Sequence, residues 1–375
     1  MDWSALRQHF PVTAHWAFLD HAAVAAPPAA CAAAIKDWAD DKAVNGITSY
    51  LPWAKRVEEA RQLAGRLLNA DPLDVCFVGS TTHGVGIVAE GYPWQPGDNV
   101  IIAAEEYPSN QYPWMNLAHR GVEARSVPSR GPRVHIDDVR AAMDGRTRVL
   151  ALSSVEFASG YRNDLESLGE LCRQRGVFFF VDAIQSLGVF PMDVQQLQID
   201  ALSADSHKWL LGPEGAGIAY VRREWVDRLH ATGVGWNSVV HAADFGHIDL
   251  KLKPHAGRWE GGTVNAGAIA GMGESLRLLL DTGIEVVRDR VLELTDYVCD
   301  RVAAAGAAVF SARGVEEKSG IVSLLTPGKD PKAVMKRCKD AGVVVNVRGG
   351  RVRVSPHCYN TVEDLDRFLD VLRAA

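Results

Sequence analysis

The sequence predicts an α/β fold in which buried strands carry polar residues at their carboxyl ends. The run 176–181 (GVFFFV) is continuously apolar and opens with glycine, which is typical of a strand covered on both faces. Asp182 follows this run directly, and Lys208 comes shortly after a second strand-like run, 200–204. Segments with helical periodicity, such as 52–68, separate runs of this kind.

The chain has 375 residues, 47% hydrophobic and 23% charged, as in ordinary globular proteins. This length suffices for two domains, and we expect a large domain at 16–265 and a small one at 1–15 and 266–375. The net charge of −6 argues against nucleic-acid binding. Without an eighteen-residue apolar run or a signal-peptide pattern, we expect a cytoplasmic protein that does not contact membranes.

The six cysteines are scattered, and no two form a C-x-x-C pair. This pattern predicts reduced thiols and argues against a zinc site or a disulfide framework, so we expect no metal. Neither a P-loop nor a strand-led dinucleotide-binding glycine motif is present.

Local patterns predict the remaining elements in chain order. We expect strands at 17–20, 75–78, 100–103, 148–153, 218–221, 320–325, 343–347 and 351–355. We expect helices at 27–44, 52–68, from Val85, from Ala266 and at 362–372. Residues 233–260 show little periodicity, and we expect them to form loops at the active site and a dimer interface.

The segment 79–84 (GSTTHG) lies between a predicted strand and a predicted helix. Free backbone N–H groups and the helix dipole make such a helix start a phosphate site. Thr81 and Thr82 are therefore candidate phosphate ligands, although an ordinary Ser/Thr N-cap gives the same pattern.

A buried acid, a lysine and a phosphate-binding loop together suggest pyridoxal phosphate (PLP). Lys208 would form the Schiff base, and Asp182 would keep the pyridine nitrogen protonated. Gln185 would bond the ring hydroxyl, while His207, next to Asp205, would reach the phosphate. Alone, Lys208 would suit a protein surface and Asp182 a helix N-cap.

The segments VDAIQS (181–186) and SADSHKWLLGPEGAG (203–217) resemble the signature of the class V aminotransferase and cysteine desulfurase family. These are fold-type I PLP-dependent enzymes. The resemblance implies a large domain with a mostly parallel seven-stranded sheet and a small α+β C-terminal domain. The segment 107–110 and the short Arg-Gly-Gly-Arg hairpin at 348–351 resemble the isopenicillin-N-epimerase-like branch more than the desulfurases.

The resemblance also implies roles for residues outside the signature. Tyr107 would stack on the pyridine ring and influence proton transfer, and His21 and Ala23 would border the substrate. Arg353 would bind the substrate α-carboxylate. Thr263 would reach the phosphate of a neighbouring subunit, so that a homodimer completes the active site.

The cysteine that desulfurases use as a nucleophile is absent from its expected place. In the related enzymes it lies shortly before the carboxylate-binding arginine, but the interval 347–353 contains no cysteine. Cys358 lies beyond that arginine. Cysteine desulfuration is therefore strongly disfavoured.

We accordingly expect an enzyme that acts on an α-amino acid through Lys208, which would also shuttle the α-proton. A class V aminotransferase ranks first, and a C–S or β-lyase or an amino-acid epimerase ranks second. A cysteine desulfurase follows, and a non-catalytic PLP-binding protein ranks last.

Overall fold

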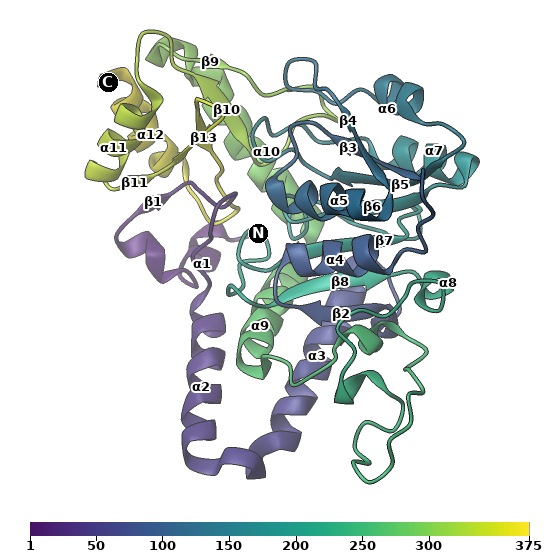
Figure 1. The fold of residues 1–375 in the computed structure, drawn as a ribbon. Coiled ribbons are helices and arrows are strands. Elements are labelled where there is room, and N and C mark those ends of the chain that lie inside the picture. Colours follow the sequence, from purple (N-terminus) through teal and green to yellow (C-terminus); the bar gives the residue numbers. More distant parts are fainter. Residues whose placement is uncertain (375) are drawn as a thin grey trace.

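The computed structural model describes residues 1–374, and its centre is a seven-stranded sheet flanked by helices (Figure 1). The strand order is β2-β8-β7-β6-β5-β3-β4, and only β8 runs antiparallel to its neighbours. The predicted α/β fold with a mostly parallel sheet is therefore confirmed. The strands are β2 (Val75–Val78), β3 (Asn99–Ala103), β4 (Glu123–Val127), β5 (Thr147–Ser153), β6 (Phe178–Asp182), β7 (Ala201–Asp205) and β8 (Gly217–Val221).

The helices were predicted in part. They are α1 (Trp3–Arg7), α2 (Ala29–Asn45), α3 (Tyr50–Leu68), α4 (Thr81–Gly91), α5 (Tyr112–Met115), α6 (Ile136–Ala142), α7 (Leu165–Arg175), α8 (Arg223–Val226), α9 (Ala266–Thr282), α10 (Ile284–Arg301), α11 (Pro331–Asp340) and α12 (Val362–Ala374). Helix α4 begins at Thr81 rather than at the expected Val85, because Ser80 already caps its first turn. None of the described helices is long and apolar enough to cross a membrane.

Strand β6 shows why the central sheet is buried on both faces. Phe179 and Val181 pack into one hydrophobic cluster, whereas Phe178 and Phe180 pack into another on the opposite face. Alternate side chains of a strand point to opposite faces, so a continuous apolar run serves two layers at once. The terminal Asp182 is the first polar residue beyond this double core.

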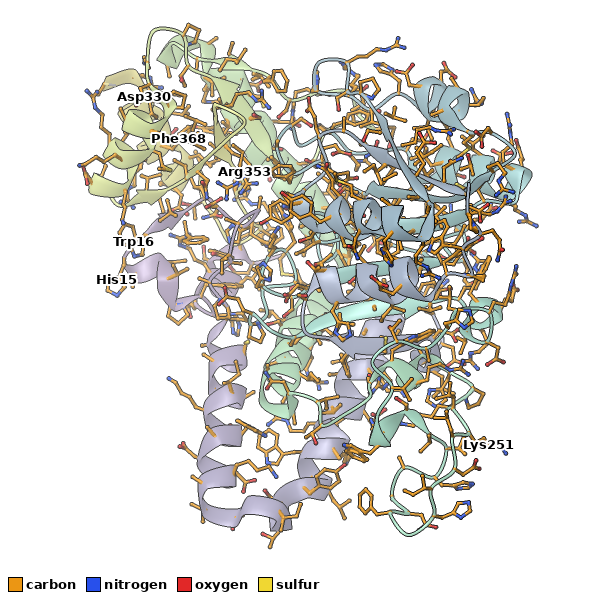
Figure 2. The ribbon with its side chains drawn as sticks, viewed as in Figure 1. His15, Trp16, Lys251, Asp330, Arg353 and Phe368 are labelled. Carbon is orange, nitrogen blue, oxygen red and sulfur yellow. The ribbon has the colours of Figure 1, made fainter. Side chains whose placement is uncertain are left out.

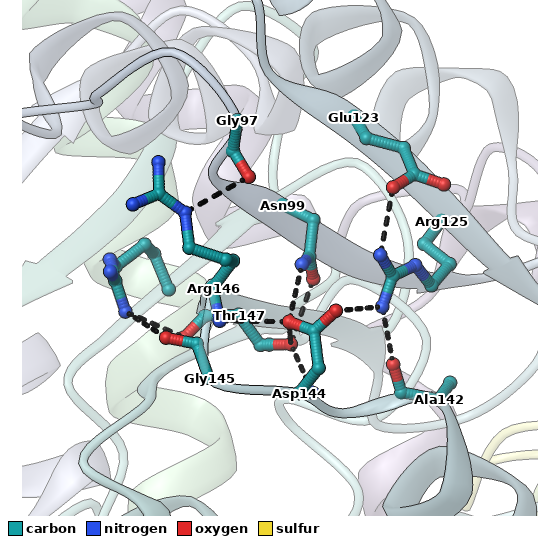
Figure 3. A network of polar contacts seen from close by, with 10 residues as sticks. Gly97, Asn99, Glu123, Arg125, Ala142, Asp144, Gly145, Arg146 and Thr147 are labelled. Carbon is teal, nitrogen blue, oxygen red and sulfur yellow. Dashed lines mark hydrogen bonds and ion pairs between the residues drawn. The ribbon is translucent and has the colours of Figure 1, made fainter.

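A polar network fixes the opposite, amino-terminal edge of the sheet (Figure 3). The Asp144 carboxylate accepts hydrogen bonds from Asn99 Nδ2 on β3 (2.9 Å) and from Arg125 Nη1 on β4 (2.9 Å). Arg125 also pairs with Glu123 (2.8 Å). The edge strand β4 is thus held by charge as well as by its backbone.

A second, four-stranded sheet lies near the C-terminus, in the order β12-β13-β10-β9. Its strands are β9 (Ala308–Val309), β10 (Val322–Leu325), β12 (Asn346–Arg348) and β13 (Arg351–Val354). The strand expected at 343–347 is divided into β11 (Val343–Val344) and β12.

Near both expected domain boundaries, the elements assigned to one domain contact elements assigned to the other. Strand β1 (Ala17–Phe18) pairs in parallel with β11, so this start of the expected large domain is bonded to the C-terminal region. Helix α9, expected to open the small domain, packs against α2 and α3. The boundaries at 16 and 266 stay predictions. The pairing of β1 with β11 favours a first boundary after β1.

Two glycines of α4 provide a matched test of helix–sheet packing. A Cβ atom at Gly84 would lie 2.2 Å from Ser203 Oγ on β7, whereas a Cβ atom at Gly86 would meet no atom within 4 Å. We expect Gly84→Ala to lower the free energy of unfolding of the apo protein by about 1–3 kcal/mol. Gly86→Ala should raise it by about 0.5–1 kcal/mol.

Urea denaturation of both variants followed by circular dichroism gives the two values. A Gly84→Ala protein as stable as the wild type would show that α4 does not lie this close to β7.

Candidate active site

A cavity of about 290 Å³ opens where β6 and β7 end, beside the start of α4 and the β12–β13 hairpin. Ligands of open α/β sheets bind at this carboxyl edge. Most of the predicted site residues line it: Ala23, Thr81, Thr82, Tyr107, Asp182, Gln185, Asp205, His207, Lys208 and Arg353.

Asp182 and Lys208 are both almost fully buried in this cavity. Burial raises the pKa of Asp182 to about 6, against a hydrogen bond from Ile184 N and the charge of Lys208. Burial also lowers the pKa of Lys208 from 10.5 to about 8, although Asp182 acts in the opposite direction. The pKa values of the acid and of the amine are therefore both moved toward neutral pH.

Residues from α4 and from the end of β7 meet at one side of the cavity. Thr81 Oγ1 accepts a hydrogen bond from Asp205 N (3.0 Å). His207 Nδ1 lies 3.2 Å from Asp205 Oδ2, while Asp205 Oδ1 is buried and has no partner among residues 1–374. This end of the cavity holds an acceptor that a ligand or a water molecule can satisfy.

The start of α4 supplies hydroxyl groups beside its free backbone N–H groups. Ser80 accepts a hydrogen bond from His83 N (3.2 Å), which leaves other N–H groups of the first turn for a ligand. Thr82 Oγ1 donates to Ser109 Oγ (2.8 Å), so the 107–110 segment is tied to the helix start.

Aromatic and amide groups border the reactive lysine. Lys208 Nζ lies 5.4 Å from the Tyr107 ring centroid, and the Tyr107 ring meets Phe157 edge-on at 5.3 Å. Gln185 accepts from Trp209 Nε1 (3.0 Å) and donates to the Ala22 carbonyl (3.1 Å). One Gln185 N–H remains for a ligand, as its predicted contact with a ring hydroxyl requires.

Arg353 lies at the junction between the C-terminal strands and the large sheet (Figure 2). Its Nη1 donates to the Phe157 carbonyl (2.9 Å) and its Nη2 to Asp20 Oδ1 (3.2 Å). Arg353 Nε is buried without a partner in the described part of the chain. Burial lowers the pKa of this guanidinium, and nearby Asp20 raises it.

Two predicted site residues are not brought into the cavity. His21 is fully buried elsewhere: its Nδ1 lies 2.9 Å from the Ser355 carbonyl and its Nε2 2.8 Å from the Tyr359 hydroxyl. Its neighbours satisfy both ring nitrogens, so the structure gives it no contact with substrate within this chain. Thr263 borders a different hollow, next to Gly79 and His83, and its role across a subunit interface stays a prediction.

Sequence reasoning missed Arg348, which also lines the cavity. It missed the buried carboxyl groups of Glu106 and Glu156 as well. Burial and the charge of Glu156 raise the pKa of Glu106 well above its usual value, and burial raises the pKa of Glu156 to about 7. Glu105, the residue before Glu106, is exposed. Nothing in the local sequence indicates that Glu106 is buried and Glu105 is not.

Cys358 lies outside the cavity lining and is buried. Burial raises the pKa of its thiol to about 12. A thiolate nucleophile requires a low pKa and access to solvent, and Cys358 has neither.

The cavity residues fit PLP. The start of α4 and the unpartnered Asp205 oxygen mark a polar end, and Asp182 and Lys208 supply the acid and the amine that this cofactor needs. Lys208 would hold its aldehyde carbon, Asp182 its ring nitrogen, and Thr81 and Thr82 with His207 its phosphate.

Known proteins match this chain along most of its length. A probable cysteine desulfurase from Methanothermobacter thermautotrophicus is 27% identical over 98% of this chain and 96% of its own. The uncharacterized aminotransferase YcbU of Bacillus subtilis is 25% identical, with the same coverage of 98% and 96%. The solved cysteine desulfurase CsdA from Escherichia coli shares the fold, with a TM-score of 0.90, 24% identity, and coverage of 100% of this chain and 98% of its own.

A family model described as aminotransferase class-V matches residues 17–368. This match confirms the fold-type I architecture and, at the level of the family, PLP as the cofactor. The chain belongs to the aminotransferase class-V family.

Proposed function

We propose that this chain is a PLP-dependent aminotransferase acting on an α-amino acid. The observation that carries the proposal is the burial of Lys208 and Asp182 in one cavity, with their pKa values near 8 and 6. Perturbed acids and bases in a cleft mark catalytic sites. The family alone does not select the reaction, since one fold hosts many chemistries.

The chain's own residues account for binding and proton transfer. Bound PLP supplies an electron sink for the substrate Cα. Lys208, with its lowered pKa, would take the Cα proton and return it at the cofactor carbon, which is the proton path of transamination. Arg353 would hold the α-carboxylate, since a guanidinium binds carboxylates through paired N–H groups. Tyr107 would border the proton path.

The alternatives use the same cavity differently. Proton return to the opposite face of Cα would give an epimerase, and loss of a β-substituent would give a C–S or β-lyase. Cysteine desulfuration ranks lower because none of the six cysteines lines the cavity. A non-catalytic PLP-binding protein ranks last, because Asp182, Lys208 and Arg353 are all in place.

The central test is the absorbance spectrum of the protein after reconstitution with PLP. We expect a visible band of the bound cofactor that is lost in Lys208→Ala, because this amine makes the covalent bond. With a suitable L-amino acid, the band should convert to the pyridoxamine form, and the keto acid should be released. Lys336→Ala, an exposed lysine of α11 that pairs with Asp340 (2.7 Å), serves as the control and should keep the band.

The outcomes separate the candidate reactions. Release of pyruvate with a thiol or ammonia would replace the aminotransferase by a lyase, and D-amino acid formation would indicate an epimerase. A protein without any cofactor band after reconstitution would contradict the proposal.

The pKa of Lys208 predicts how PLP loading depends on pH. Only the neutral amine attacks the cofactor aldehyde, so the loading rate of the apo protein should rise with pH through a midpoint near about 8. The Asp182 charge raises the pKa of Lys208, so Asp182→Asn should move this midpoint to lower pH. Stopped-flow absorbance measures the profile. A midpoint near 10.5 would contradict the burial of Lys208, and an upward move in Asp182→Asn would contradict its interaction with the Asp182 charge.

A homodimer completed across its interface is part of the same proposal. Helices α2 and α3 extend from the body as two arms (Figure 1). Val44, Ile47 and Leu51 are exposed where these arms meet. Thr263 borders a hollow of about 500 Å³ that lies between these arms and the loops near Gly257. An apolar surface next to a phosphate-ligand candidate supports an interface there.

Sedimentation velocity should therefore give a dimer. Thr263→Ala should raise the dissociation constant of PLP about tenfold through loss of one hydrogen bond to a charged group. Thr263→Ser, which keeps the hydroxyl, should leave it unchanged. If the wild-type protein is a monomer, or if Thr263→Ala binds PLP as tightly as the wild type, the site is not shared between subunits.

A further inference from the structure

The β12–β13 hairpin presents several arginines on one face. Asn346 pairs with Arg353, and Arg348 pairs with Arg351, across the antiparallel strands. Directly paired residues share a face, and so do residues two apart along a strand. Gly349 and Gly350 form the turn, with φ values of 53° and 71°, so the hairpin is short and these four side chains lie together.

Arg351 is directed away from the cavity by other partners. Its Nε donates to Ser323 Oγ (3.0 Å), and its guanidinium lies 3.9 Å from the centre of the Phe310 ring. Arg348 and Arg353 both line the cavity, whereas Arg351 does not. The hairpin therefore delivers two guanidinium groups to the site.

A chain of hydrogen bonds holds these two groups in fixed places. Asp20 Oδ1 accepts from Arg353 Nη2 (3.2 Å), and Asp20 Oδ2 accepts from Asn346 Nδ2 (2.7 Å). Asn346 Oδ1 in turn accepts from Arg348 Nη1 (2.7 Å). Asp20 and Asn346 thus link the two arginines by hydrogen bonds, and Arg348 lies close enough for its charge to lower the pKa of Arg353.

The charges of the two arginines are compensated differently. Arg353 pairs with Asp20 (3.2 Å). Arg348 forms no ion pair with any residue from 1 to 374, and its acceptors are the neutral Asn346 side chain and the Val347 carbonyl (2.9 Å). A guanidinium has five N–H groups, so Arg348, which has no ion-pair partner in the described chain, keeps donors for a ligand.

The two carboxylates that line the cavity do not come from the hairpin. Asp182 and Asp205 both come from the ends of the large-sheet strands β6 and β7, where the cofactor would bind. Of the acidic residues near the hairpin, Asp20 is already engaged by Arg353 and Asn346. An anion beside Arg348 would therefore meet N–H donors that no carboxylate accepts from, although the charge of Arg348 lowers the pKa of Asp20.

We propose that Arg348 binds a second anionic group of the substrate, so that the enzyme acts on α-amino acids with acidic side chains. This inference rests on the proposed function. Arg353 binds the α-carboxylate and Arg348 the side-chain acid, each at its own end of the Asp20–Asn346 chain. Arg348 is then a specificity-determining residue and not a second ligand of the α-carboxylate.

The test compares unreactive acids of equal length on the PLP-loaded protein. Isothermal titration calorimetry should show that succinate, with two carboxylates, binds at least about tenfold more tightly than butyrate, with one. Arg348→Gln should abolish this difference and leave butyrate affinity unchanged within about twofold. Arg351→Gln, on the same face but outside the cavity, is the matched control and should keep the preference.

A kinetic comparison gives the second readout. Arg348→Gln should raise the KM for L-aspartate or L-glutamate about tenfold to a hundredfold, with little change for L-asparagine or L-glutamine. Equal binding of succinate and butyrate by the wild type would overturn the inference, as would an Arg348→Gln variant that weakens both acids alike. Failure of the protein to load PLP would overturn the proposed function as well, and the cofactor band distinguishes these two cases.

Discussion

The structure depends on burying an acid and an amine together at the carboxyl edge of the central sheet. Neither group could remain charged in this position alone, because removal from water disfavours the ionised form. Asp182 is the last residue of the doubly buried strand β6, and Lys208 follows the neighbouring strand β7. The same apolar strands that stabilise the fold therefore create the low-dielectric site in which both pKa values move toward neutrality.

Further buried acids lie close to this pair. Glu106 accepts from Ser153 N (2.5 Å) at the end of β5, and Ser153 pairs in register with Asp182. Glu156 accepts from Asn163 Nδ2 (2.8 Å). Burial and the charges of Glu156 and Asp182 raise the pKa of Glu106, so negative charge on one of these acids disfavours ionisation of Glu106. At Asp182 a hydrogen bond from Ile184 N and the charge of Lys208 oppose the effect of burial and favour the ionised form.

The sequence could predict the large sheet and the core of the site for one physical reason. Strands buried on both faces leave continuous apolar runs, and their ends must carry whatever polar residues the site uses. Strand β4 escaped this reasoning because it lies at the edge, where EARSV mixes charge with apolar residues. The sequence placed His21 beside the substrate, but it is buried next to Tyr359, and this contact depends on how the C-terminal segment folds against it. Arg348 lacked any signal because its place depends on the register of a hairpin.

The short hairpin is consistent with the absence of a cysteine from the interval 347–353. A mobile cysteine needs a loop long enough to reach the substrate, whereas Gly349 and Gly350 close the turn here within two residues. The strands beside this turn are paired residue by residue, and the Asn346 side chain accepts a hydrogen bond from Arg348. A segment built this way cannot deliver a moving nucleophile, but it can hold a guanidinium at a constant position. A preorganised charge lowers the cost of binding a substrate group, and under the proposed function the covalent chemistry would then rest on Lys208.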